Sequence, residues 1–223
     1  MLGDELVGVY LHGSVALESF DPVESDVDFL VATESELGEG EVERLAALHV
    51  RLGDRLDGSY LPREVFRRFD PARVIHPHIE SRDGQLALDH HGGETMIYRH
   101  VLRECGVTLF GPPPRELIDP TSGADLRWGV CDVLTNWWAP MLADPPAWLQ
   151  EEQYRHYAVV TMCRVRFTLE RSAVVSKPEA AKWAAAHVDV KWRDLIASAA
   201  VRGSCGYEET MAFVRETLEA ASC

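Results

Sequence analysis

Two short stretches near the start of the chain hold residues that suit a phosphorylated ligand and a metal ion. Gly13 and Ser14 follow the apolar segment 6–11, and Asp26 and Asp28 come after a gap of eleven residues. Side chains alternate along a strand, so residues 26 and 28 face the same side and bring two carboxylates together. Such groups repel each other unless a cation lies between them, and Mg²⁺, which prefers oxygen ligands, is the expected ion. Gly13 permits a close backbone approach, and Ser14 at a helix start suits a phosphate.

A third carboxylate, Asp57, lies in the segment 55–61, which reads as a strand. If this strand pairs beside the one that holds Asp28, Asp57 joins the acidic cluster as a metal ligand or as the general base for an attacking hydroxyl group. Taken alone, a Gly-Ser pair or an Asp-x-Asp pair is more often a solvated turn. In this order, each beside an expected strand, they favour attack on an α-phosphorus with pyrophosphate as the leaving group.

Strands and helices must alternate along the first hundred residues to position these groups. Strands are expected at 6–11, 27–32 and 55–61, and the apolar residues of 35–53 recur at helical spacing. Three consecutive prolines at 112–114 interrupt this pattern. Beyond them only helices are expected, at 122–142, 151–172, 178–187, 190–202 and 207–221. We therefore expect an α/β domain with a small mixed sheet over residues 1–111 and an all-α helical bundle over residues 112–223.

The motifs resemble a known family. Gly13-Ser14, the eleven-residue gap and Asp26-Val27-Asp28 look like the signature of the polymerase-β-type nucleotidyltransferases. More narrowly, the sequence is similar to the streptomycin/spectinomycin-type aminoglycoside adenylyltransferases. The segments that carry this similarity are LHGS at 11–14, SDVD at 25–28, GVTLFGP at 106–112, ELIDP at 116–120 and SKPEAAKWA at 176–184. The resemblance covers nearly the whole chain.

The resemblance implies an Mg²⁺-dependent enzyme of antibiotic resistance that moves AMP from ATP to a hydroxyl group of a small molecule and releases pyrophosphate. It assigns metal binding to Asp26 and Asp28, and phosphate contact to Gly13 and Ser14. Asp57 matches the position of the family's base, which is usually Glu.

Lysines in the later motif bear on the substrates. In streptomycin-modifying members this region offers acids to the drug, whereas here it carries Lys177, Lys182 and Lys191. Such lysines suit a triphosphate better than a cationic sugar, so Lys177 is expected to contact ATP. The expected acceptor is an aminoglycoside or aminocyclitol such as spectinomycin rather than streptomycin, and an unrelated compound with a hydroxyl group is the alternative.

The charge argues against polymeric partners. The chain has a net charge of −14, and residues 1–60 hold fourteen acidic residues but only three arginines. An acidic protein repels nucleic acid and attracts cations, so we expect a small-molecule acceptor and no nucleic acid. No apolar run approaches the roughly 20 residues that cross a bilayer. Residues 1–5 also lack the basic start of a secretory signal, so we expect a cytoplasmic monomer or weak dimer with no membrane partner.

The cysteines and the remaining histidines belong to residue types that can form disulfides or bind metals, and here they are interpreted as structural. Five widely spaced cysteines without a Cys-x-x-Cys pair predict no disulfide framework and mostly buried thiols. Asp89-His90-His91 contains metal-ligating residue types but is interpreted as a loop before a helix at 94–104. His76 and His78, on either side of Pro77, are interpreted as a surface turn, because the sequence offers no evident partner cluster for them.

Two other functions agree with the first motif. A protein-modifying adenylyltransferase of the antitoxin type resembles only the first domain and is usually much shorter. A non-catalytic nucleotide sensor keeps the metal site without an acceptor. Labelled ATP offered with a panel of aminocyclitols, and then with cell lysate, separates these functions from small-molecule transfer.

Overall fold

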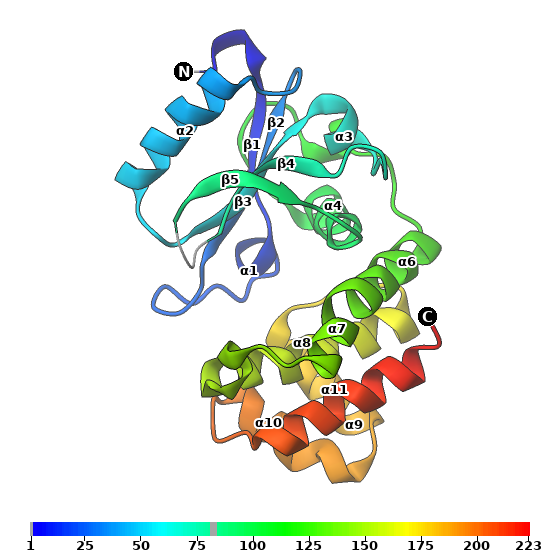
Figure 1. The fold of residues 1–223 in the computed structure, drawn as a ribbon. Helices are drawn as coiled ribbons and strands as arrows, with labels where there is room; N and C mark the ends of the chain where they lie inside the picture. Colours follow the sequence, from blue (N-terminus) through cyan, green and yellow to red (C-terminus); the bar gives the residue numbers. More distant parts are fainter. Residues whose placement is uncertain (1, 81–83) are drawn as a thin grey trace. The chain divides into compact units, whose positions relative to one another are not determined.

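The computed structural model describes residues 2–80 and 84–223, and the chain divides into two compact units, Met1–Thr121 and Ser122–Cys223. The first unit is a sheet with helices on its faces, and the second is a helical bundle (Figure 1). Residues 122–223, all of them described, contain no strand. The expected fold class is therefore confirmed. Within the described part of the chain, every helix is too short or too polar to span a bilayer.

A mixed sheet of six strands, counted over the described residues, forms the first unit in the order β5-β4-β3-β2-β1-β6. The strands are β1 (Leu6–Leu11), β2 (Val27–Thr33), β3 (Leu56–Pro62), β4 (Ile75–Ile79), β5 (Leu86–His90) and β6 (Val107–Phe110). β2 and β3 run parallel, and the other neighbouring pairs are antiparallel. β1, β2 and β3 confirm the three strands expected from the sequence.

Helices cover both faces of this sheet (Figure 1). The helices of the first unit are α1 (Gly13–Ala16), α2 (Glu39–Leu52), α3 (Arg63–Arg67), α4 (Glu94–Cys105) and α5 (Pro114–Leu117). On one face Leu45 of α2 is buried in a cluster with Phe29 and Tyr60. On the other face Leu102 of α4 and Phe66 of α3 are buried against the alternate residues of the same strands. Because successive side chains of β2 and β3 point to opposite faces of the sheet, these strands contribute to an apolar layer on each face.

The structure overturns two expectations about residues 75–91. The segment around Pro77 is the strand β4 rather than a surface turn, and Asp89 and His90 end the strand β5 rather than lying in a loop. A proline lacks the N–H group that a central strand position requires. β3 pairs with β4 only at His78 and Ile79, so Pro77 lies outside that ladder.

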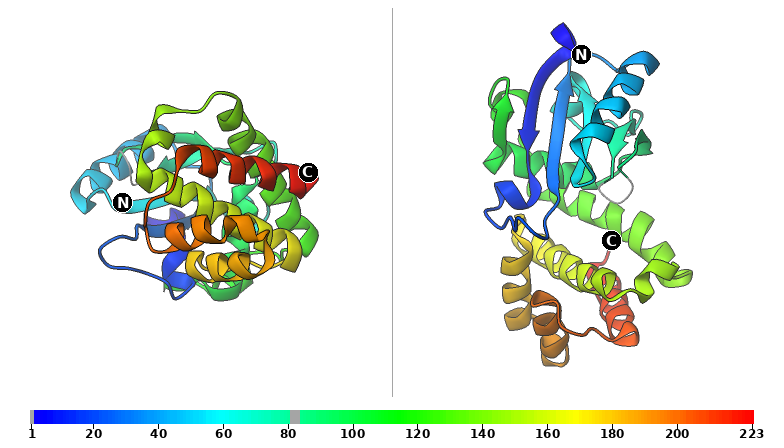
Figure 2. Two further views of the ribbon diagram at one scale, coloured as in Figure 1. Left: turned by 90° about the horizontal axis from the view of Figure 1, so that it is seen from below. Right: turned by 90° about the vertical axis from the view of Figure 1, so that its left-hand side faces the viewer.

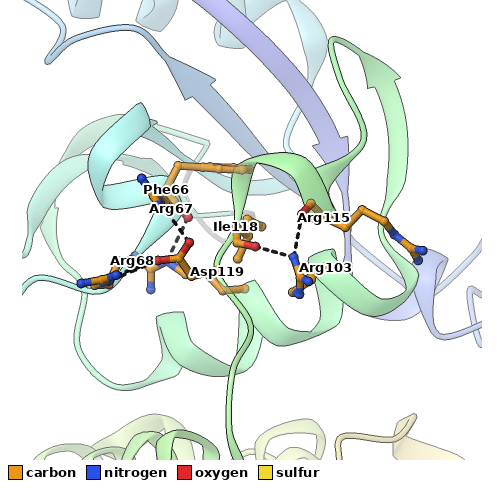
Figure 3. Close-up of polar contacts among 8 residues, drawn as sticks. Phe66, Arg67, Arg68, Arg103, Arg115, Ile118 and Asp119 are labelled. Carbon is orange, nitrogen blue, oxygen red and sulfur yellow. Dashed lines mark hydrogen bonds and ion pairs between the residues drawn. The ribbon is translucent and has the colours of Figure 1, made fainter.

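The segment that follows the three prolines packs onto the first unit (Figure 3). Nε of Arg67 donates to the carboxylate of Asp119 at 2.9 Å, and Arg103 donates to the carbonyl oxygen of Ile118. The side chain of Ile118 lies in the core under α3 and α4. These contacts explain why the first unit extends to Thr121, ten residues beyond the boundary expected at residue 111.

A central helix organises the second unit. Its helices are α6 (Gly123–Val133), α7 (Ala139–Ala143), α8 (Glu152–Arg171), α9 (Lys177–His187), α10 (Arg193–Ala200) and α11 (Tyr207–Ala221). α8 contacts α6, α9, α10 and α11, and the left view of Figure 2 shows it between α11 and the pair α9 and α10. The segment expected as one helix at 122–142 instead comprises α6, a π-helical turn at Leu134–Trp138 and α7.

One pair of cysteines forms a disulfide that the sequence analysis did not predict. Cys131 of α6 and Cys223 at the end of the chain are disulfide-bonded, with Cα atoms 5.3 Å apart. The sequence spacing of 92 residues carries no sign that these two positions meet. Cys163 and Cys205 are buried as expected, whereas Cys105 is exposed.

Candidate active site

The turn after β1 packs directly on Asp28. The backbone N–H of His12 donates to the carbonyl oxygen of Asp28 at 3.0 Å. Gly13, the next residue, has a φ of +54°, and a Cβ atom added there would overlap the Asp28 carboxylate. A residue with a side chain therefore meets both backbone strain and a steric clash at position 13. Glycine lets the start of α1 approach this carboxylate closely.

The hydroxyl group of Ser14 is buried and has no hydrogen-bond partner within the part of the chain that the structure describes. A buried polar atom without a partner costs about 1–3 kcal/mol. Ser14 lies in the first turn of α1, where backbone N–H groups have no partner inside the helix. A ligand oxygen bound at this point would satisfy the hydroxyl group, so the site fits the phosphate that the sequence motif predicts.

The predicted metal ligands lie where β2 and β3 begin. The parallel register pairs Asp28 with Asp57, so both side chains lie on the same face of the sheet. Asp26 precedes β2 and is exposed, whereas Asp28 and Asp57 are partly buried. The ligand atoms of the three aspartates do not all lie within 4.8 Å of one another among the described residues. A shared ion therefore requires rotation of these side chains, and their acidic character fits a divalent cation with oxygen ligands.

A hydrogen-bonded group lies behind Asp57, and it includes histidines that sequence reasoning assigned to loops. Nε2 of His78 lies 3.9 Å from Oδ1 of Asp57, and Nδ1 of His78 lies 2.9 Å from the Ser59 hydroxyl. The same hydroxyl lies 3.5 Å from Nε2 of His91. Burial, together with the charges of His78 and His76, lowers the pKa of His91 to about 4, which makes its ring neutral at pH 7. The alternation of His76 and His78 around one residue was the available sequence signal, because it is the period of a strand.

Lys177, the predicted ATP contact of the helical domain, begins α9 in the second unit. The preceding Ser176 caps this helix, and its hydroxyl donates to Glu179 at 2.8 Å. The ammonium group of Lys177 lies 5.9 Å from the centre of the Tyr157 ring. The capping pattern fixes where the helix starts, and the role of Lys177 toward the triphosphate stays a prediction.

Comparisons with known proteins agree with this architecture. Residues 118–222 match the family model described as aminoglycoside adenylyltransferase, C-terminal domain. The fold is similar to a crystal structure of the spectinomycin adenyltransferase AAD(9) from Enterococcus faecalis with ATP and spectinomycin, with a TM-score of 0.77 and 16% sequence identity. That similarity covers 98% of this chain and 93% of the other. The sequence has no match among curated proteins.

The chain therefore has the fold of that structure, an α/β domain followed by a helical domain. Residues 118–222 of this chain match the domain that ends the aminoglycoside adenylyltransferases. The family resemblance found in the sequence motifs is thereby confirmed.

Proposed function

We propose that the chain transfers AMP from ATP to a hydroxyl group of an aminocyclitol or aminoglycoside and releases pyrophosphate. The observation that carries this proposal is the register that sets Asp28 beside Asp57, at the place where Gly13 packs against Asp28. The family of the C-terminal domain supports an aminoglycoside as the acceptor. The similar fold of an enzyme crystallised with ATP and spectinomycin supports these two compounds as substrates.

We assign the binding of Mg²⁺ to Asp26, Asp28 and Asp57. The assignment is supported by the paired register of two of these aspartates and by their position at the starts of neighbouring strands. When bound, Mg²⁺ neutralises phosphate charge and polarises the phosphorus that is attacked.

The chain's own groups then have separate tasks. The buried hydroxyl of Ser14 donates a hydrogen bond to a phosphate oxygen, and Gly13 allows that phosphate to approach the backbone. Lys177 adds positive charge for the triphosphate. The carboxylate of Asp57 accepts the proton of the acceptor hydroxyl, so that the hydroxyl oxygen attacks the α-phosphorus and pyrophosphate leaves.

The acceptor follows from charge as well as from family. Aminoglycosides and aminocyclitols are cationic, and a protein with a net charge of −14 attracts them over several ångströms. Spectinomycin is the first compound to test, which makes antibiotic resistance the proposed role. We place the reaction in the cytoplasm, where ATP is supplied.

The direct test is incubation of the purified chain with Mg²⁺, ATP labelled at the α-phosphorus, and spectinomycin or streptomycin in separate reactions. We expect label on spectinomycin and one pyrophosphate released per transfer. Asp28→Asn removes a proposed metal ligand and should lower the rate by at least about 1000-fold. Glu43→Gln, which removes one charge from the exposed face of α2, serves as the matched control and should keep the rate.

Four results contradict the proposal or one of its assignments. Label on a protein from cell lysate, with none on any small molecule, indicates a protein-modifying enzyme. ATP that binds and stays intact with every acceptor indicates a nucleotide sensor. Full activity of Asp28→Asn removes the metal assignment, whereas full activity of Asp57→Asn shows that another group accepts the proton.

A further inference from the structure

β4 and β5 carry metal-ligating side chains on one face near the edge of the sheet. In their antiparallel register His76 lies opposite Asp89, and His78 lies opposite Ala87. Opposite residues share a face, and the alternation along β4 places the following Glu80 on the face of His78. One ligand atom from each of His78, Glu80 and Asp89 lies within 4.8 Å of the other two. No other trio of such residues meets this criterion in the described ranges 2–80 and 84–223.

Hydrogen bonds orient the His78 ring within this group. Nδ1 of His78 lies 2.9 Å from the hydroxyl oxygen of Ser59, and the same oxygen lies 3.5 Å from Nε2 of His91. With Nδ1 held on this hydroxyl, the other ring nitrogen of His78, Nε2, lies 3.9 Å from the Asp57 carboxylate and is the nitrogen that can bind a metal ion.

A nitrogen lone pair among carboxylates calls for a positive charge. We propose that a divalent transition-metal ion, with Zn²⁺ as the representative, binds His78, Glu80 and Asp89. Imidazole nitrogen combined with carboxylate oxygen suits Zn²⁺ better than Mg²⁺, which prefers oxygen alone. Its three ligands differ from Asp26, Asp28 and Asp57, to which Mg²⁺ is assigned, although His78 lies 3.9 Å from Asp57. This inference does not rest on AMP transfer.

The geometry requires only local adjustment. Ligand bonds to Zn²⁺ are about 2.0–2.2 Å long, so ligand atoms of one ion lie roughly 3–3.5 Å apart. Glu80 is partly exposed and Asp89 is exposed, so their side chains are able to rotate inward, whereas His78 is fixed through Ser59. A hydrogen bond of this kind to the second nitrogen of a metal-binding imidazole is a common supporting contact. The ion would tie β4 to β5 where the sheet ends.

The test is calorimetric titration of the full chain with ZnCl₂ at neutral pH, together with thermal unfolding in the presence and absence of Zn²⁺. Asp26→Asn combined with Asp28→Asn and Asp57→Asn supplies the background, because it removes the three ligands of the proposed Mg²⁺ site. We expect this background to bind one Zn²⁺ per chain and its Tm to rise with added Zn²⁺. Asp89→Asn or Glu80→Gln in the same background should weaken binding by at least about 100-fold, and Ser59→Ala by about tenfold. Glu43→Gln, an exposed charge on α2, should change neither value.

Two outcomes overturn the inference. One is that the background variant binds no Zn²⁺. The other is that Asp89→Asn and Glu80→Gln, with unchanged Tm in the absence of metal, bind Zn²⁺ as tightly as the background, which places the ion on other surface residues. Loss of AMP transfer in the background variant bears on the proposed function alone, because the readouts here are binding and unfolding.

Discussion

Asp28 is constrained from two directions, by the turn that precedes α1 and by the neighbouring strand. Gly13 packs against its carboxylate, and His12 donates to its carbonyl oxygen. On the other side the β2–β3 register sets Asp57 beside it. The backbone therefore sets these two side chains next to each other on one face of the sheet. A site built in this way is sensitive to small changes at positions that carry no charge.

The first prediction concerns Gly13→Ala. The new methyl group meets a φ of +54° and overlaps the Asp28 carboxylate, so that carboxylate must move. We expect AMP transfer to fall at least about 100-fold because of the displaced metal ligand, and the free energy of unfolding to fall by about 1–3 kcal/mol. Steady-state kinetics and urea unfolding measure the two effects. Gly38→Ala is the control, because a Cβ there lies 3.7 Å from Glu41 in ordinary contact and should leave both values nearly unchanged.

The second prediction concerns Ser14→Ala. The substitution removes a buried hydroxyl that has no partner among the described residues, so the free energy of unfolding should stay the same or rise slightly. If the hydroxyl binds a phosphate, the KM for ATP should rise about tenfold, which equals about 1.4 kcal/mol of lost binding. Kinetics at varied ATP concentration and thermal unfolding test the pair of effects. An unchanged KM would show that Ser14 does not contact the nucleotide.

At the scale of strands and helices, the elements that could be predicted from the sequence are those with a regular pattern of apolar residues. β2 and β3 are buried on both faces over much of their length, and β1 and β2 are rich in apolar residues, so the positions of these strands and the pairing of Asp28 with Asp57 were predictable. β5 has exposed residues at four of its five positions, and β4 reads His-Pro-His at its centre. Pairing with neighbouring strands, rather than local composition, makes these two segments strands. The histidine group behind Asp57 was missed for the same reason.

Helix α2 carries a buried histidine that links stability to pH. Nε2 of His49 lies 2.8 Å from the hydroxyl of Tyr60, and its ring stacks on Phe29. Burial lowers the pKa of His49 and raises the pKa of Tyr60 to about 12, so both groups are neutral at pH 7. The unfolded chain takes up a proton on His49 below about pH 6.5, the ordinary value, while the folded chain does so only at lower pH.

The third prediction follows from this difference. The free energy of unfolding should fall as the pH drops below about 6.5, because the unfolded state binds more protons. His49→Gln should reduce this slope by up to about 1.4 kcal/mol per pH unit, the limit for one proton. Urea unfolding between pH 5 and pH 8 measures the slope. The exposed His187→Gln is the control, and an equal slope for wild type and His49→Gln would contradict the assignment.

At the scale of the whole molecule, the two units differ in how their ends are held. The first unit ends in a segment tied down by Asp119 and Ile118, which is why the three prolines do not mark its boundary. In the second unit the disulfide joins Cys131 of α6 to Cys223 beyond α11. That bond encloses most of the helical bundle in one covalent loop. The boundary of the first unit and the disulfide of the second both depend on contacts between segments that are far apart in the sequence. Local sequence patterns therefore do not predict them.

The last prediction concerns reduction of this disulfide. Closing a loop of this length restricts the unfolded chain, so reduction should lower the stability of the second unit by about 2–4 kcal/mol. Hydrogen exchange with and without a reducing agent should show lost protection in peptides from Ser122–Cys223 and unchanged protection in β1, β2 and β3. Cys105→Ser, which replaces an exposed free thiol, is the control and should leave the response to reduction intact. Equal loss of protection in both units would show that they unfold as one. We place the reaction in the cytoplasm, a reducing compartment that keeps cysteine pairs as thiols. There the stability of the reduced form determines how much of the helical bundle is folded.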